Sequence, residues 1–132
     1  MPVIVEHIHN PTADDQNDLT KTYNDAPDWL KTAEQAGQWM TDILSSSETA
    51  LYAGRFNDRL IAAAVVQKSE SNWHLVWLNV RSVTRDRCVG RRIISELQRM
   101  ANEHDCSLSA EKPADQQVVE KFPSYLKELM AY

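Results

Sequence analysis

The sequence predicts an α/β (α+β) domain with a mixed sheet, in which an antiparallel strand meander is followed by a strand–helix–strand unit and flanked by helices. Three apolar segments separated by polar turns lie between residues 51 and 80. An amphipathic helical pattern that ends near His104, and then a short apolar segment at 106–110, follow them. A length of 132 residues is typical of one domain, so we expect residues 1–132 to fold as a single unit.

The residues before the meander predict one strand and two helices. Val3 to Ile8 is the best candidate for a first strand, and Thr12 fits the N-cap of a helix that extends to about Tyr23. Asp28 is expected to cap a second helix, because apolar residues then recur at spacings of three and four. We expect these apolar residues to lie in the core. They are Trp29, Ala33, Ala36, Met40, Ile43 and Leu44.

The middle of the chain predicts three antiparallel strands. Leu51–Phe56 and Arg59–Lys68 are apolar runs joined by the two-residue turn Asn57-Asp58, which is a β-hairpin signal. A second polar turn leads to the strand Trp73–Val80. Asparagine and aspartate tolerate the positive φ that such a tight turn requires.

A helix and a parallel strand are expected after the meander. One face of the helical pattern holds the apolar residues Ile93, Ile94, Leu97, Met100 and Ala101. After this helix-length crossover, residues 106–110 should pair parallel to the strand Trp73–Val80, with a right-handed connection. Two short helical patterns, 116–121 and 125–130, are separated by Pro123.

Composition limits the possible partners and the compartment. A net charge of -5 and a pI near 5.3 argue against general nucleic-acid binding, which needs a basic surface. No apolar run approaches the roughly 18 residues of a membrane span. Cys88 and Cys106 form no recognisable framework, so we interpret them as free thiols and expect a cytoplasmic protein.

A pair of histidines raises the question of a metal. His7 and His9 are two residues apart, so they would share one face of the first strand. The sequence offers no third ligand nearby. We therefore favour two surface histidines and predict no metal site.

The loop between the strand Trp73–Val80 and the next helix is basic in an acidic chain. Four arginines lie in or beside it: Arg85, Arg87, Arg91 and Arg92. A strand that opens directly into a helix directs backbone N–H groups and the positive helix end to one point, which suits a phosphate. An ordinary turn with solvated arginines is the alternative that these residues leave open.

The order of elements, with this basic loop after the fourth strand, resembles the GNAT acetyltransferase fold. The signature loop of that fold is Arg/Gln-x-x-Gly-x-Gly/Ala, and the corresponding residues are Arg85-Asp-Arg-Cys-Val-Gly90. The resemblance implies that acetyl-coenzyme A places its pyrophosphate on the backbone amides of this loop and its pantetheine along the preceding strand. The coenzyme residues implied are Leu78, Asn79, Val80, Arg85, Asp86, Arg87, Cys88, Val89, Gly90, Arg91 and Arg92.

Cys88 occupies the position of the first glycine in the signature. Glycine is used where backbone must approach a phosphate closely. Either the φ of Cys88 is negative and its Cβ points away from the ligand, or the coenzyme binds less tightly.

Two stretches carry a closer resemblance. They are Tyr-Ala-Gly-Arg-Phe-Asn-Asp-Arg-Leu-Ile-Ala-Ala at residues 52–63 and Leu-Asn-Val-Arg-Ser-Val-Thr-Arg-Asp-Arg-Cys-Val-Gly at residues 78–90. Both are similar to the PanZ (PanM) family, GNAT-fold proteins that bind acetyl-coenzyme A and drive maturation of PanD, the aspartate 1-decarboxylase zymogen. The resemblance implies that Arg55 and Asn57 contact the decarboxylase. The tail after Ala110 departs from the fold, because its pattern is helical where a strand hairpin is usual.

No residue is assigned a catalytic role from the sequence. Tyr125 and Tyr132 are the tyrosines that follow the fifth strand, where this fold often places a general acid, and His74 or Glu70 could act as a base through water. A packing or surface role explains these residues better than a catalytic one. A coenzyme-sensing binding protein, an N-acetyltransferase acting on an amine and a member of the fold without a ligand therefore remain as alternatives.

Overall fold

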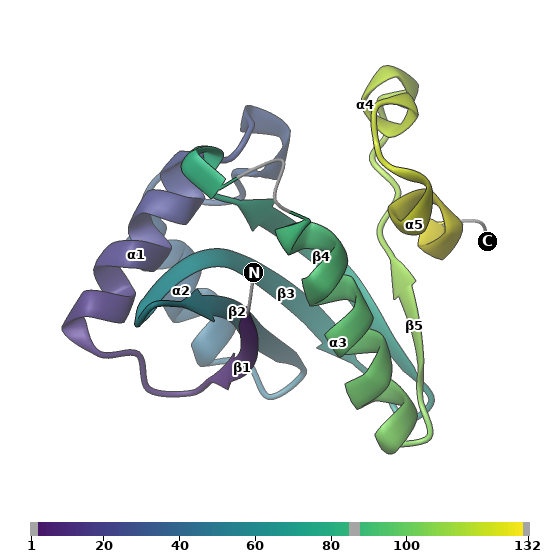
Figure 1. Ribbon diagram of the computed structural model, residues 1–132, viewed down its shortest axis with the longest axis horizontal. Helices are drawn as coiled ribbons and strands as arrows, with labels where there is room; N and C mark the ends of the chain where they lie inside the picture. Colours follow the sequence, from purple (N-terminus) through teal and green to yellow (C-terminus); the bar gives the residue numbers. More distant parts are fainter. Residues whose placement is uncertain (1–2, 85–87, 131–132) are drawn as a thin grey trace.

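The computed structural model describes residues 3–84 and 88–130, which form one five-stranded sheet with helices on both of its faces (Figure 1). The strands are β1 (Ile4–Ile8), β2 (Thr49–Phe56), β3 (Arg59–Lys68), β4 (Asn72–Val80) and β5 (Ser107–Ala110). The helices are α1 (Ala13–Asn24), α2 (Ala36–Leu44), α3 (Val89–Glu103), α4 (Gln116–Glu120) and α5 (Ser124–Lys127). Short 3-10 turns are η1 (Asp28–Leu30), η2 (Ser82–Thr84) and η3 (Glu128–Met130).

The sheet has the predicted topology. Its strand order is β1-β2-β3-β4-β5, and each neighbouring pair is antiparallel except β4 and β5, which are parallel. The turn between β2 and β3 is the predicted Asn57-Asp58, with φ angles of 49° and 65°. The meander, the strand–helix–strand unit and the two short helical segments of the tail are thus confirmed.

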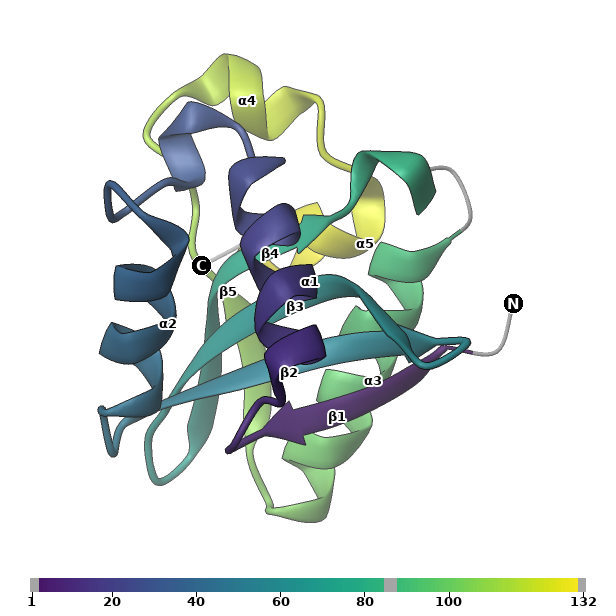
Figure 2. The ribbon, with the colours of Figure 1, turned by 90° about the vertical axis from the view of Figure 1, so that its left-hand side faces the viewer.

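Two hydrophobic clusters separate the sheet from its helices. Helices α1 and α2 cover one face and α3 covers the other (Figure 2). The predicted inner face of α3 is confirmed, since Ile93, Ile94, Leu97 and Ala101 are buried and Met100 is partly buried. On the other face, Tyr23 packs against Trp39 and Trp77, with ring centroids 4.9 and 6.1 Å apart. Successive residues of β3 are buried in different clusters, since Ala62 belongs to the core under α3 and Ala63 to the core under α1 and α2.

The predicted continuous helix from Asp28 to Leu44 is wrong. The chain forms only the turn η1, then an extended segment, and α2 begins at Ala36. Trp29 is 46% exposed and Leu44 is 37% exposed. Neither lies in the core, contrary to the expectation from the sequence.

Hydrogen bonds from distant residues explain the break in that helix. The Tyr23 hydroxyl donates to the carbonyl of Ala33 and accepts from its N–H group. The indole Nε1 of Trp77 donates to the carbonyl of Leu30 at 2.8 Å. Because these backbone groups already have partners, the segment does not need helical hydrogen bonds.

Strand β4 contains an irregularity at Val76. The pairing with β3 shifts there, because Trp77 is opposite Val65 while Leu75 is opposite Val66. Pairing with β5 ends close by, at Leu75 and Ala110. The next amide, Glu111 N, donates to Leu75 O at 2.7 Å, and the chain then turns away from the sheet. The two parallel strands therefore diverge immediately after this point.

Candidate functional site

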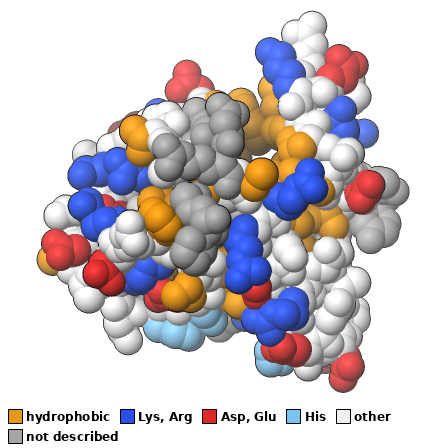
Figure 3. All heavy atoms as spheres, in the orientation of Figure 1, with side chains coloured by type: hydrophobic (Ala, Val, Ile, Leu, Met, Phe, Trp, Pro, Cys, Tyr) orange, Lys and Arg blue, Asp and Glu red, His pale blue; other side chains and the backbone are white. Residues whose placement is uncertain are grey.

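A cavity of about 460 Å³ lies where β4 and β5 diverge. Its floor is the part of β4 from Leu75 to Asn79, and its lining is largely hydrophobic. One wall comes from residues 25–30 and the other from the tail, and the rings of Trp29 and Phe122 meet with centroids 5.8 Å apart. In Figure 3, hydrophobic side chains gather at the base of the tail and Lys and Arg side chains follow α3 just below them. The gap between the strands is therefore hollow, and the β4 residues of its floor lead to Val80, whose Cγ2 would lie 3.8 Å from a Cβ built on Gly90 at the start of α3.

The start of α3 lacks compensation from its own chain in the described residues. Its N-cap residue, Cys88, makes no capping hydrogen bond through its side chain, and the first turn of the helix contains no acidic residue. A helix N-terminus carries unpaired N–H groups and about half a positive charge. This end of α3 therefore favours an external anion.

The backbone of Cys88 is left-handed, with φ 59° and ψ 23°. Of the two alternatives that the sequence left open, a negative φ at this position is excluded, and weaker coenzyme binding stays a prediction. Glycine adopts this conformation without strain, whereas a residue with a Cβ pays roughly 1–2 kcal/mol. The signature glycine is thus explained by backbone geometry, and the exposed thiol of Cys88 stands where the family pattern has only hydrogen.

The tail closes on the same helix turn. A Cβ added to Gly90 would lie only 2.9 Å from the Tyr125 hydroxyl, so glycine permits this close approach. The guanidinium carbon of Arg91 is 5.2 Å from the centre of the Tyr125 ring, within cation–π range. Burial raises the pKa of Tyr125, the nearby Arg91 opposes this, and Cys88 adds to it. The hydroxyl therefore stays protonated at neutral pH.

The predicted coenzyme residues separate into three groups. Arg85, Asp86 and Arg87 lie outside the described residues. Leu78, Val80, Cys88, Val89, Gly90 and Arg91 lie along the diverging part of β4 and the start of α3. Asn79 is buried, and Arg92 turns toward Val3 and Glu96.

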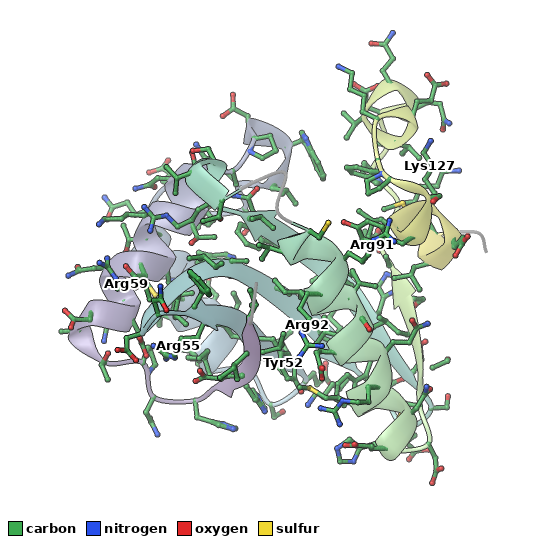
Figure 4. The ribbon with its side chains drawn as sticks, viewed as in Figure 1. Tyr52, Arg55, Arg59, Arg91, Arg92 and Lys127 are labelled. Atoms are coloured by element: carbon green, nitrogen blue, oxygen red, sulfur yellow. The ribbon has the colours of Figure 1, made fainter. Side chains whose placement is uncertain are left out.

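The side chains of Asn79 and Arg92 are engaged within the protein. Asn79 Nδ2 donates to Thr22 O on α1 at 3.0 Å. Arg92 Nε donates to Val3 O at 3.2 Å, and its Nη1 is 2.8 Å from Glu96 Oε1. Figure 4 shows Arg91 beside α5 and Arg92 on the side of β1. Of the two arginines, only Arg91 faces the tail.

Arg55, a predicted partner-binding residue, is held by carboxylates that the sequence reasoning did not identify. Its Nε is 2.6 Å from Glu6 Oε2, and its two terminal nitrogens lie 3.1 Å from the two carboxylate oxygens of Asp15. Further bonds reach Glu6 Oε1 and the carbonyl of Asp58, so all five N–H donors of Arg55 are used. Hydrogen bonds to Asp15 and then Glu6 raise the pKa of Arg55. Asn57, in contrast, is exposed at the tip of the hairpin.

Arg59 forms a second ion pair between the hairpin and α1. Its Nη2 is 2.6 Å from Asp18 Oδ1, and the backbone N–H of Leu60 donates to Asp18 Oδ2 at 3.0 Å. Asp18 is completely buried, and the hydrogen bonds from Arg59 lower its pKa. Figure 4 shows Arg55 and Arg59 side by side on this edge of the molecule. These pairs fix the shape of the hairpin.

The family model of the PanZ acetyltransferase (GNAT) domain matches residues 2–127. The chain belongs to the PanZ family. It is 33% identical over 100 residues to the PanD regulatory factor of Salmonella typhimurium, covering 75% of this chain and 68% of that protein. The PanD regulatory factor of Escherichia coli is 47% identical over 49 residues, covering 37% and 39% of the two chains. The resemblance seen in the sequence is thus confirmed.

Solved structures confirm the GNAT fold. A putative N-acetyltransferase of E. coli, YhhK, determined bound to coenzyme A, is 27% identical with a TM-score of 0.64, covering 96% of this chain and 90% of that one. A ribosomal-protein-alanine N-acetyltransferase of Brucella melitensis superposes with a TM-score of 0.72 at 12% identity, covering 99% and 94%. This second likeness concerns the fold alone.

Two kinds of feature are absent from the part of the chain that the structure describes: a membrane-spanning helix and a metal-binding cluster. No helix there has the length and apolar character needed to cross a bilayer. Residues 3–84 and 88–130 also contain no group of three or more His, Cys, Asp or Glu side chains arranged to hold a metal ion.

Proposed function

We propose that this chain is a PanZ-like regulator that binds acetyl-coenzyme A and, with it, promotes maturation of PanD, the aspartate 1-decarboxylase zymogen, in the cytoplasm. The observation that carries the proposal is the start of α3, which no described residue compensates, together with the cavity between β4 and β5. Membership of the PanZ family and two relatives named PanD regulatory factor support the partner. The coenzyme A bound to the related YhhK supports the ligand.

The residues present fit such a ligand. The N–H groups of Val89, Gly90 and Arg91 would hold the pyrophosphate at the positive end of α3, with charge from Arg91 and from Arg85 and Arg87. The strand segment Leu78–Val80 would hold pantetheine, and the hydrophobic cavity would exclude water from the thioester. Asp86 and Cys88 would line the loop. Arg92 would join the site only by leaving Glu96.

The proposed partner surface is the hairpin tip. Asn57 is exposed there and presents its amide group, while Arg55 holds the turn through Asp58 and anchors it to α1 through Asp15. Arg55 would contact PanD directly only by exchanging one of these carboxylates for a group of the partner. We therefore expect Asn57 to contact PanD directly, and Arg55 mainly to hold the hairpin in the conformation that PanD binds.

Calorimetry and co-purification test this function together. We would measure acetyl-coenzyme A binding to the wild type, to Arg91→Ala and to Arg99→Ala, a matched arginine at the far end of the same helix that pairs with Glu96 and Glu103. Arg91→Ala should weaken binding by about 1–3 kcal/mol, the loss of a charged hydrogen bond, whereas Arg99→Ala should bind normally. Tagged wild type should retain PanD only with acetyl-coenzyme A present. Equal affinity in all three proteins, or no heat with the wild type, would contradict the proposal.

An N-acetyltransferase is the second candidate, and one observation favours it. The protonated Tyr125 hydroxyl lies beside the start of α3, and a protonated acid near the thiolate is what acetyl transfer needs. Steady release of free thiol from acetyl-coenzyme A with an added amine, lost in Tyr125→Phe, would support the enzyme. Coenzyme-dependent binding of PanD, with no thiol release that depends on the amine, would support the regulator.

A further inference from the structure

A polar cluster at the end of the sheet lies outside the sites described so far. Ser109 of β5 stands opposite His74 of β4 in the parallel register. Its neighbours Leu108 and Ala110 face the core under α3, so Ser109 points to the opposite face of the sheet. Ser109 Oγ is 2.7 Å from His74 Nδ1, and His74 Nε2 is 2.6 Å from Glu111 Oε2. Hydrogen bonds therefore connect a hydroxyl to a base, and the base to an acid that orients it. This is the arrangement of an activated nucleophile.

Hydrogen bonding gives this cluster a direction. In the tautomer with its proton on Nε2, His74 donates to a carboxylate oxygen of Glu111 and presents Nδ1 as an acceptor. Ser109 then donates its O–H to His74 Nδ1 at 2.7 Å, a shorter approach than the 3.4 Å between Ser109 Oγ and Asn72 Oδ1. Asn72 Nδ2 donates to Ser109 Oγ at 3.0 Å, and Ser107 donates to Asn72 Oδ1 at 3.2 Å. In this tautomer the hydroxyl proton of Ser109 is aimed at the base that would remove it.

The cluster borders an open hollow of about 490 Å³, which Lys112 also lines. This hollow and the cavity between β4 and β5 share Ala110, Glu111 and Met130 as lining residues. Ser109 itself is only 8% exposed, so its oxygen is shielded on most sides. Lys112 lines the same hollow as Ser109 and brings positive charge to the space in which a substrate oxyanion would develop.

We propose that Ser109 is a nucleophile toward acyl esters and thioesters, with His74 as its general base and Glu111 orienting His74. In the first step Ser109 Oγ bonds to the carbonyl carbon while its proton moves to His74 Nδ1. The C–O or C–S bond breaks, and the leaving alcohol or thiol takes that proton. Water, deprotonated by His74, then releases the acyl group as a carboxylic acid and restores Ser109.

The hollow beside Ser109 shares a wall with the cavity between β4 and β5, in which the coenzyme is proposed to bind. This shared wall points to a coenzyme A thioester as the donor of the acyl group. This choice of source rests on the proposed function, whereas the reactivity of Ser109 does not. The two parts can therefore be tested with different reagents.

A fluorophosphonate probe tests the nucleophile. It should label the folded wild type at Ser109, forming an Oγ–P bond with loss of fluoride, as mapped by peptide mass spectrometry. Ser109→Ala should abolish the label, and His74→Gln and Glu111→Gln should slow it at least about tenfold, since a positioned base contributes that much or more. Ser47→Ala, an exposed serine outside this cluster, should label like the wild type. Thermal unfolding would confirm that each variant is folded.

A label on another residue, or equal rates in wild type and His74→Gln, would overturn the proposal. Acetyl-coenzyme A then tests the source. Release of acetate and free coenzyme A, lost in Ser109→Ala and in Arg91→Ala while Arg91→Ala still reacts with the fluorophosphonate, identifies the thioester as the acyl donor. Fluorophosphonate labelling without any hydrolysis of acetyl-coenzyme A, when calorimetry shows that it binds, would overturn the thioester source.

Discussion

Helices α1 and α3 begin in opposite ways. At the start of α1, the Thr12 side chain accepts from Asp15 N at 3.1 Å, and Asp14 and Asp15 place negative charge in the first turn. At the start of α3, Cys88 offers no such cap and the first turn has no acidic residue. The positive end of α1 is thus compensated by its own chain, whereas none of the described residues compensates the positive end of α3. A helix N-terminus is a candidate anion site only where no capping or acidic side chain of the same chain already occupies it.

The arginines near these two helices also differ in their partners. Arg55 and Arg59 bind Asp15 and Asp18 of α1 and hold the hairpin in place. Arg91, in the first turn of α3, meets the ring of Tyr125. Charge near α1 therefore serves stability, and we expect charge near α3 to serve a ligand. The predictions below test each side of this comparison.

Removing Asp18 should have the largest effect on stability. Asp18→Ala leaves the N–H of Leu60 buried without a partner and separates Arg59 from α1, so we expect a loss of about 3 kcal/mol in the free energy of unfolding. Chemical denaturation measures it. Asp14→Ala, an exposed acid on the same helix, should cost less than about 1 kcal/mol. A loss below that of the control would show that the ion pair does not stabilise the hairpin.

Replacing Cys88 by glycine should stabilise the protein and tighten coenzyme binding. The left-handed backbone of Cys88 is strained, so Cys88→Gly should gain about 1 kcal/mol of stability. Removing the side chain should also let a phosphate approach the amides. Denaturation and calorimetry measure the two effects, and lower coenzyme affinity would show that the thiol belongs to the site.

Removing the cap of α1 should affect stability alone. Thr12→Ala loses the bond to Asp15 N and should cost about 1 kcal/mol. Calorimetry should find the same affinity for acetyl-coenzyme A as in the wild type. A changed affinity would mean that the two helix ends are coupled, contrary to the comparison.

Acid should produce the smallest effect, through His7. Burial, then the charges of His9 and Lys68, lower the pKa of His7 to about 4. The unfolded chain takes up a proton on His7 near pH 6.5, whereas the folded chain does not until about pH 4. The free energy of unfolding is therefore highest above pH 6.5 and falls as the pH is lowered from 6.5 to about 4. Much of the His7 side chain remains in contact with solvent, so screening keeps this loss below about 1 kcal/mol. Denaturation at several pH values should show a weaker dependence in His7→Asn.

Local signals made most of the fold predictable. The Asn57-Asp58 turn, the Thr12 cap and the apolar face of α3 depend on residues close in sequence, and all three are confirmed. The broken helix after Asp28 was missed because its cause is distant, in the hydrogen bonds of Tyr23 and Trp77. Periodicity alone describes one helix at a time and carries no information on such partners.

The candidate site was predictable in position but less so in detail. The basic loop and its helix pointed to the start of α3. The pairing of Arg55 with Glu6 and Asp15 was not visible, since these residues lie 49 and 40 positions away in the chain. The meeting of Tyr125 with Gly90 likewise depends on how the tail folds back. Contacts that join distant elements decide which charged residues are free for a ligand.

Backbone NMR during a titration with acetyl-coenzyme A tests the central claim most directly. The amide resonances of Val89, Gly90 and Arg91 should shift as the coenzyme is added, while those in the first turn of α1, Ala13 to Asp15, should stay unchanged. Saturable binding that leaves the α3 amides in place would contradict the account, because the anion would then be held elsewhere.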